Sequence, residues 1–233
     1  MADDARYLIE IRDSLLGGLG VFAKTDTPKG TRVLAESFLP GYALSPAEQK
    51  EYLSLHKHTG DLARARYARY LRLPWDRITK LHRAVLSVYE ANALTNIDGV
   101  VLLGSRFNHS CVLNVHFAHN EALDKMTFHA VRDIEKGEEL AIDYVKAANL
   151  TRSHRQEKLS KYEFICTCPA CVVSVLADES ERKREQMRIL DQEFLPAVIF
   201  PTNKNCAVAV TAAQELAQLM ISEGLFSGRL GNA

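Results

Sequence analysis

Four of the five cysteines in this 233-residue chain have the side-chain type and the spacing of a metal site. Cys166, Cys168 and Cys171 lie in the hook C-T-C-P-A-C, and Cys111 stands alone upstream. Thiolates bind zinc best as a closed tetrahedral set of four, so a hook of three needs a fourth ligand from elsewhere. We expect Cys111 to complete the set, because a fourth thiolate closes a structural site. The alternatives for the fourth ligand are His109, His116, His119 and His129.

The tight spacing of the hook favours zinc over unliganded thiols or a redox pair. Residues 168–171, C-P-A-C, form a knuckle-like C-x-x-C without a thioredoxin-like setting. A site closed by four thiolates has no open position for water, so we expect zinc to hold the structure and not to perform the chemistry. The fifth cysteine, Cys206, is expected to be a buried thiol.

The segment that carries Cys111 reads R-F-N-H-S-C over residues 106–111 and is a candidate binding segment. If zinc joins it to the hook, four side chains surround one pocket: Asn108, His109, Tyr162 and Phe164. Buried Asn and His side chains must find hydrogen-bond partners. Spacing alone does not distinguish a ligand site from loop residues that satisfy one another.

Residues 18–23 read G-L-G-V-F-A, which formally matches the G-x-G-x-x-[GA] pattern of dinucleotide-binding turns. The context does not fit such a site, because residues 28–30, P-K-G, form a turn where the pattern requires a helix. Two interpretations remain open. The glycines either form a tight turn that needs positive φ angles or bring the backbone close to a ligand.

Short β-strands are predicted on both sides of a helical region. Alternation and turn residues predict two strands and a hairpin: residues 7–12, 32–38, and 113–118 paired with 126–131. Residues 139–144, E-L-A-I-D-Y, predict a further strand that ends in Asp143 and Tyr144. Spacing alone favours an ordinary edge strand with a surface tyrosine there.

Helices are predicted between and after these strands. A capping box with proline at the first helical position, S-P-A-E, opens a helical insert over residues 45–98. Residues 151–162 predict a short capped helix that leads to the hook. Beyond the hook we expect a helical tail packed on the domain, with helices at 178–193 and 207–223, breaks at Pro196 and Pro201, and a stop at Gly224.

The composition is that of an ordinary globular protein, with 47% hydrophobic residues, 25% charged residues and zero formal net charge. A neutral chain lacks the basic character of nucleic-acid-binding proteins, so we expect no direct contact with nucleic acid. The apolar runs are too short to span a bilayer, and the acidic first residues are unlike a secretory signal. Clustered cysteines are typical of an intracellular metal site. We therefore expect a protein of the cytoplasm or the nucleus that does not contact membranes.

Taken together and in this order, the segments resemble those of SET-domain protein-lysine methyltransferases. The matching segments are residues 18–23, 106–111, 138–144 and 162–171. The insert and the hook are most similar to the branch that carries a MYND zinc finger, although the cysteines of such a finger are missing from these 233 residues. The resemblance implies an α+β fold of several small β-sheets. Its parts would be a SET domain over 6–145 with the 45–98 insert, a post-SET zinc segment over 146–172 and a helical tail over 173–233.

The resemblance also implies roles for the candidate residues. S-adenosylmethionine would lie against residues from three parts of the chain: Gly18, Leu19, Gly20, Asn108, His109, Tyr162 and Phe164. Tyr144 would match the catalytic tyrosine of the family. One structural Zn²⁺ would be bound by Cys111, Cys166, Cys168 and Cys171.

By this resemblance the chain is expected to transfer a methyl group from S-adenosylmethionine to a lysine amine of a protein substrate, histone or non-histone. The alternative is a SET-like binding or adaptor module that has a structural zinc but no turnover. One departure is visible, because Leu113 occupies a position where the family usually has proline. Loss of proline frees φ without removing a ligand, so we expect a looser turn and an intact zinc site.

Overall fold

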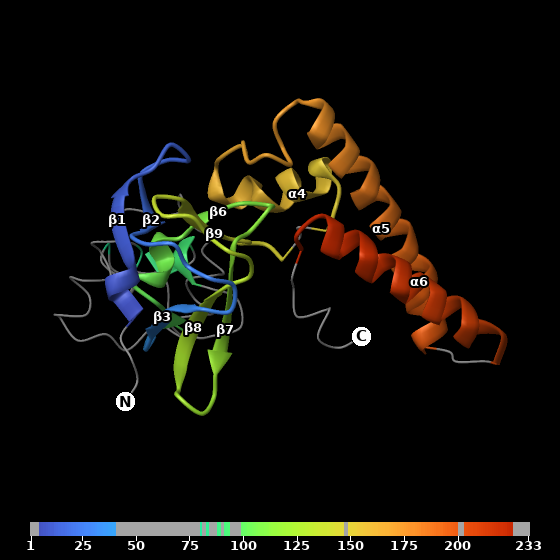
Figure 1. Ribbon diagram of the computed structural model, residues 1–233, viewed down its shortest axis with the longest axis horizontal. Helices are drawn as coiled ribbons and strands as arrows, with labels where there is room; N and C mark the ends of the chain where they lie inside the picture. Colours follow the sequence, from blue (N-terminus) through green and yellow to red (C-terminus); the bar gives the residue numbers. More distant parts are fainter. Residues whose placement is uncertain are drawn as a thin grey trace.

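The computed structural model describes residues 5–40, 80, 83, 88–89, 91–93, 99–146, 149–199 and 203–225. These residues form small β-sheets from which two long helices extend to one side (Figure 1). A shorter helix, α4 (Arg152–Leu159), lies between the two parts. The predicted α+β class, with small sheets and helices toward the C-terminus, is confirmed.

The sheet that positions the candidate residues has four strands in the order β1-β2-β9-β6. These are β1 (Ile9–Asp13), β2 (Leu19–Ala23), β9 (Glu139–Ile142) and β6 (Asn108–His109). β6 pairs in parallel with β9, so that His109 lies opposite Ile142. β9 is therefore an interior strand, and the expectation of an edge strand is wrong. Tyr144, two residues beyond β9, is half-buried and not a surface side chain.

A second sheet contains the predicted hairpin. Its strands, in the order β3-β8-β7, are β3 (Arg32–Glu36), β8 (Lys125–Ala130) and β7 (Val115–Asn120). Register runs from Val115 opposite Ala130 to Asn120 opposite Lys125, which confirms the hairpin. A third, smaller sheet pairs β4 (Leu39–Pro40) with β5 (Gly99–Val100).

The first predicted strand begins later than expected. Residues Ala5–Leu8 form a 3-10 helix, η1, before β1 begins. Ile9 is buried and Ile11 is exposed, and β1 lies at the edge of its sheet. In the turn that follows, Gly17 has a φ of 124° and Gly18 a φ of 60°, which confirms a tight turn with positive φ angles at these glycines, whereas Gly20 lies in β2.

The main core is shared by the two larger sheets. Val21, Phe107, Phe128 and Leu140 are completely buried in it. The rings of Phe107 and Phe128 stack with their centroids 4.8 Å apart. Burial of side chains of this size stabilises the fold by about 1.5–3 kcal/mol each. Because Phe107 directly precedes Asn108, this core fixes the start of β6.

Helices follow the sheets in the expected order. α4 and the 3-10 helix η4 (Ser160–Tyr162) occupy the region of the predicted short helix. α5 (Val175–Ile199) and α6 (Asn203–Ser222) form the predicted tail. α5 runs through Pro196, so the expected break there is wrong. Proline removes one backbone hydrogen bond, and three residues from the helix end this loss affects only the last turn.

The end of α6 is confirmed at Gly224, whose φ is 67°. The N–H of Gly224 donates to the Ile221 carbonyl at 3.0 Å, and the N–H of Leu225 donates to the Met220 carbonyl at 2.8 Å. This pair of bonds is a Schellman motif, which favours glycine at the left-handed position.

The tail packs on the sheets through an apolar cluster. Leu113 and Val131 from the sheet region join Met187 of α5 and Met220 of α6, and all four are buried. The prediction of a helical tail packed on the domain is confirmed. Cys206 is exposed on α6 and is not the buried thiol that we expected, because a hairpin of two helices covers only part of each helix.

Most of the predicted 45–98 insert lies outside the described residues. Within it, Val88, Tyr89, Ala91 and Asn92 are helical. Asn92 is buried, and its Nδ2 donates to the Val88 carbonyl at 2.8 Å.

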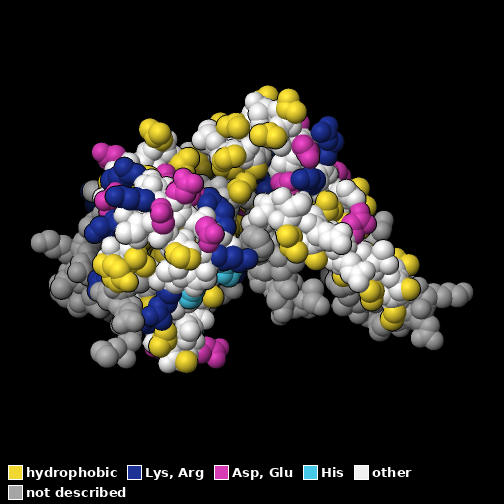
Figure 2. Space-filling model, in the orientation of Figure 1, with side chains coloured by type: hydrophobic (Ala, Val, Ile, Leu, Met, Phe, Trp, Pro, Cys, Tyr) yellow, Lys and Arg dark blue, Asp and Glu magenta, His cyan; other side chains and the backbone are white. Residues whose placement is uncertain are grey.

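Two properties of the molecule as a whole bear on its partners. No helix in the described part of the chain is both long and apolar enough to cross a membrane. Lys and Arg are mixed with Asp and Glu over the sheet part of the face shown in Figure 2. This face therefore does not have the single-sign charge that binds nucleic acid without sequence preference.

Candidate functional site

Four cysteine sulfurs converge where the segment after β6 meets the hook. The Sγ atoms of Cys111, Cys166, Cys168 and Cys171 all lie within 4.8 Å of one another. Cys111 Sγ is 3.9 Å from Cys166 Sγ and 3.6 Å from Cys171 Sγ. A tetrahedron with zinc–sulfur bonds of about 2.3 Å has edges of about 3.8 Å. The spacing fits one zinc ion and is far longer than the disulfide bond of about 2.05 Å.

These four thiols cannot all ionise without a cation. Hydrogen bonds with the other three thiols lower the pKa of Cys168. The pKa of Cys111 is raised by its own hydrogen bonds with the three cysteines of the hook. The pKa of Cys171 is lowered to about 6, first by its hydrogen bond with Cys111. Negative charges this close oppose one another's ionisation. A divalent cation removes that conflict, so the donor set suits zinc.

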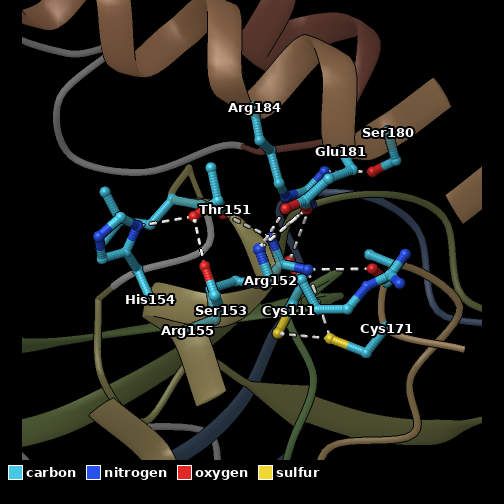
Figure 3. A network of polar contacts seen from close by, with 12 residues as sticks. Cys111, Thr151, Arg152, Ser153, His154, Arg155, Cys171, Ser180, Glu181 and Arg184 are labelled. Carbon is cyan, nitrogen blue, oxygen red and sulfur yellow. Dashed lines mark hydrogen bonds and ion pairs between the residues drawn. The ribbon is translucent and has the colours of Figure 1, made fainter. Parts of the chain in front are cut away.

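Helix α4 holds the hook from one side. Gln156 Oε1 accepts a hydrogen bond from the N–H of Cys166 at 3.1 Å, and its Nε2 donates to the Phe164 carbonyl at 2.8 Å. Arg155 is 1% exposed and donates to Cys171 Sγ at 3.4 Å (Figure 3). Sequence reasoning did not select Arg155 or Gln156. Their position in a predicted helix directly before the cysteine hook was the feature of the sequence that could have pointed to them.

His109 connects the cysteine cluster to the end of β9. The backbone N–H of Tyr144 donates to His109 Nδ1 at 3.2 Å, so Nε2 carries the ring proton. Nε2 lies 3.3 Å from Cys111 Sγ, which places that proton toward the sulfur. Burial lowers the pKa of His109 and keeps the imidazole neutral at pH 7. A hydrogen bond of this kind fixes the orientation of a metal ligand.

Tyr144 is held on several sides. Its hydroxyl donates to the carbonyl oxygen of Phe107 at 2.7 Å. Its ring centroid lies 5.4 Å from that of His109 and 5.1 Å from that of Tyr162. Burial raises the pKa of Tyr144, so the hydroxyl keeps its proton at neutral pH. A small hollow adjoins the ring, and Asn92, Ser105, Phe107 and Tyr162 are among the residues that line it.

Asn108 is fixed by Glu139, which sequence reasoning did not single out. Asn108 Nδ2 donates to Glu139 Oε1 at 2.7 Å and to the Leu19 carbonyl at 3.2 Å. Ser14 Oγ donates to the same carboxylate at 2.8 Å. Glu139 therefore ties the glycine turn to β6. It lies in the segment that predicts β9, but the alternation of that segment does not distinguish it.

The glycines of the turn are needed for different reasons. A Cβ on Gly20 would overlap the Glu139 carboxylate and lie 3.0 Å from Asn108 Nδ2. Close packing of these two side chains therefore explains Gly20. A Cβ on Gly18 would meet nothing within 4 Å, although its φ of 60° favours glycine. The backbone at Gly18 thus has room beside it for a ligand.

Tyr162 and Phe164 reach the same place as β6 and β9. The Phe164 ring centroid lies 6.1 Å from that of His109, and Tyr162 contacts Tyr144 as described above. The cysteine cluster thus brings together the aromatic and polar side chains that the sequence suggested, and Asn108 links them to the glycine turn. Their roles in binding and catalysis stay predictions.

The turn after Cys111 is held without proline. Ser110 Oγ donates to the Val112 carbonyl at 2.9 Å and accepts from the N–H of Val112 at 3.0 Å. Leu113 is 5% exposed and packs in the cluster with Met187. Side-chain hydrogen bonds and apolar contacts with the tail therefore fix this turn.

Known proteins share parts of this chain. Histone-lysine N-methyltransferase set5 of Schizosaccharomyces pombe is 35% identical over 188 residues, which are 75% of this chain and 54% of that protein. Protein-lysine N-trimethyltransferase SMYD5 of Homo sapiens is 37% identical over 94 residues, 38% of this chain and 22% of that protein. A SET and MYND domain-containing protein of Dictyostelium discoideum is 35% identical over 83 residues, 35% of this chain and 15% of that protein. The chain thus spans about half the length of these relatives or less.

A match to a protein-family model assigns the chain to a family. The model described as SET domain matches residues 18–145, more than half of the chain. That range includes the glycine turn, β6, β9 and Tyr144, and it ends before the hook. The chain belongs to the SET-domain family.

Proposed function

We propose that this chain is an S-adenosylmethionine-dependent protein-lysine N-methyltransferase. The observation that carries the proposal is the position of Tyr144. Its buried hydroxyl is fixed by Phe107, its ring lies next to that of His109, and Tyr144 helps to line a small hollow. Two of the relatives are named as lysine methyltransferases, which supports the same reaction.

Methyl transfer to lysine requires a neutral amine held in line with the departing sulfur. A lysine amine has an ordinary pKa of about 10.4, so water favours the ammonium. Tyr144 and Phe164 would form the walls of an aromatic channel that disfavours the charged form by desolvation. The Tyr144 hydroxyl donates a hydrogen bond to the backbone carbonyl of Phe107. Its oxygen would therefore be left to accept a hydrogen bond from the amine and orient it.

When bound, S-adenosylmethionine supplies an electrophilic methyl group on its sulfonium. The hydrogen bond between Asn108 and Leu19 makes the two parts of the proposed binding surface contiguous. The space beside Gly18 leaves room for the ligand. The complete proposed set is Gly18, Leu19, Gly20, Asn108, His109, Tyr162 and Phe164.

The proposed zinc ion is structural. Its ligands would be Cys111, Cys166, Cys168 and Cys171, whose sulfur spacing supports the assignment. Four thiolates close the coordination shell, so the metal would position the pocket and not bind substrate. Tyr162 and Phe164 lie next to the hook and would depend on the metal for their positions.

The substrate would be a lysine of a histone or of another protein. The relative from Schizosaccharomyces pombe is named as a histone-lysine enzyme, and human SMYD5 is named as a protein-lysine enzyme. Clustered thiols that bind a metal suit a reducing compartment, the cytoplasm or the nucleus. The mixed charge seen in Figure 2 supports a protein partner more than nucleic acid.

Methyl transfer from labelled S-adenosylmethionine to an extract, followed by mass spectrometry of methyl-lysine, tests the proposal. Tyr144→Phe should reduce turnover by about a hundredfold or more and leave the dissociation constant of the cofactor within about twofold, because the hydroxyl orients the amine. Tyr7→Phe, which alters an exposed tyrosine of η1, is the control. Undiminished turnover in Tyr144→Phe would refute the assigned role. Cofactor binding by wild type without any methyl transfer would favour the adaptor.

A further inference from the structure

Two arginine side chains are buried next to the cysteine cluster. Arg155 of α4 is 1% exposed, and Arg184 of α5 is fully buried. A guanidinium stays charged in a protein, and a buried charge is costly unless an opposite charge lies near it. Zinc held by four thiolates has a net formal charge of two negative units. A guanidinium in contact with the cluster would stabilise that negative charge.

Arg155 lies directly against the cluster. Its Nη2 donates to Cys171 Sγ at 3.4 Å and to the Ala170 carbonyl at 3.0 Å. Its Nη1 lies 3.6 Å from Glu181 Oε2 on α5.

Arg184 reaches the same cluster from the tail (Figure 3). Its Nη2 donates to the backbone carbonyl of Cys111 at 3.5 Å. Its Nη1 donates to Glu223 Oε2 at 2.5 Å and also to Ser180 Oγ. Glu223, just beyond α6, pairs with Lys183 Nζ at 3.1 Å. Arg184 therefore joins α5 and the end of α6 to a proposed metal ligand.

The tail also completes helix α4. Thr151, the N-cap residue, forms no side-chain cap. The backbone N–H of Arg152 donates instead to the carboxylate of Glu181 on α5, at 2.7 and 2.9 Å to its two oxygens. A carboxylate at a helix N-terminus satisfies a backbone donor and interacts favourably with the helix dipole. α5 thus fixes the helix that carries Arg155.

We propose that helices α5 and α6 are part of the metal centre. Arg155 donates to the Cys171 sulfur and Arg184 to the backbone carbonyl of Cys111, and Glu223 holds Arg184 in place. Arg184 is a positioning residue that acts through the backbone of Cys111. This inference rests on the zinc site proposed above and not on methyl transfer itself. It predicts that the tail determines how firmly zinc is retained.

The rate of zinc loss to a chromogenic chelator, pyridylazoresorcinol, measures this coupling in the intact zinc-loaded chain. Arg184→Met should release zinc about tenfold faster or more, because loss of a partner of a metal ligand typically weakens binding by about 10- to 100-fold. Arg188→Met, one turn further along α5, removes an arginine paired with Glu185 and should release zinc at the wild-type rate. Arg184→Lys should give an intermediate rate, because it keeps the charge and loses the planar fork.

Cobalt-substituted protein separates an effect on the thiolates from a general loss of stability. The thiolate-to-cobalt charge-transfer band should shift in Arg184→Met and stay unchanged in Arg188→Met. If Arg184→Met does not fold, Glu223→Gln replaces it, since it keeps Arg184 and removes the charge of its anchor. Faster zinc release is expected there too.

Three results would count against these assignments in different ways. Wild-type release rates in both Arg184→Met and Glu223→Gln, or in Glu223→Gln alone if Arg184→Met cannot be made, overturn the inference. A wild-type protein that binds no zinc overturns it together with the metal assignment. Absent methyl transfer with the zinc coupling intact overturns the proposed activity and supports the inference.

Discussion

His109 makes two contacts that join the metal cluster to the proposed catalytic residue. One ring nitrogen accepts from the backbone of Tyr144, and the other lies 3.3 Å from Cys111 Sγ. The neutral ring can serve both neighbours only in the tautomer with the proton on Nε2. At the scale of residues, the site is therefore a chain of short contacts that runs from sulfur to tyrosine.

Glu139 plays a comparable part for the glycine turn, and Glu139→Ala tests it. The free energy of unfolding should fall by about 1–3 kcal/mol, because the Asn108 amide and the Ser14 hydroxyl lose their acceptor. Affinity for S-adenosylmethionine should fall as well, since Asn108 would no longer be fixed beside Leu19. Urea titration and isothermal titration calorimetry measure the two effects. Equal values in Glu139→Ala and in Glu135→Ala, which removes an exposed carboxylate nearby, would contradict this role.

Sequence reasoning selected Asn108, His109 and Tyr144 from motif and resemblance, and it passed over Glu139. The difference has a physical cause. Asn and His next to a metal ligand are unusual residue types for a buried segment, whereas one Glu in the polar run before β9 is ordinary. Its importance comes from hydrogen bonds with Asn108 and Ser14, which are distant in sequence, and no local pattern reveals those contacts.

At the scale of elements, the parallel pairing of β6 with β9 positions the site. The β7–β8 hairpin could be predicted because its two strands alternate and are joined by a short polar loop. β6 has two residues, too few for any periodicity, and its partner lies far along the chain. For this reason the sequence favoured an edge strand where the structure has an interior one.

The stability of the junction between α5 and the end of α6 should depend on pH, because Glu223 titrates there. Burial alone would raise the pKa of Glu223, but hydrogen bonds from Ser180, Lys183 and Arg184 hold it below its ordinary value of 4.5. A carboxyl with a lowered folded-state pKa stabilises the fold fully above its ordinary pKa. This contribution is lost as the pH falls through the folded-state value.

The free energy of unfolding of the wild type should therefore fall more steeply with acid than that of Glu223→Gln, between about pH 5 and pH 2. Urea unfolding at a series of pH values measures the difference between the two proteins. Glu179→Gln alters an exposed carboxylate that also pairs with Lys183 and should follow the wild-type curve. Parallel curves for wild type and Glu223→Gln would show that the buried ion pair does not stabilise the junction.

At the scale of the whole molecule, the proposed zinc site joins three parts that are distant in sequence. Cys111 follows β6, the hook follows η4, and the tail contributes Arg184. The spacing of the cysteines was enough to predict the first junction. The contribution of the tail could not be predicted, because it depends on which face of α5 packs against Leu113 and Val131.

Removal of zinc, followed by titration with S-adenosylmethionine, tests the central claim most directly. The purified chain is expected to contain one tightly held zinc and to bind the cofactor. After zinc is stripped, cofactor affinity should fall by about tenfold or more, since the segment with Tyr162 and Phe164 loses its anchor, and added zinc should restore it. Unchanged cofactor affinity in the zinc-free chain would contradict the account.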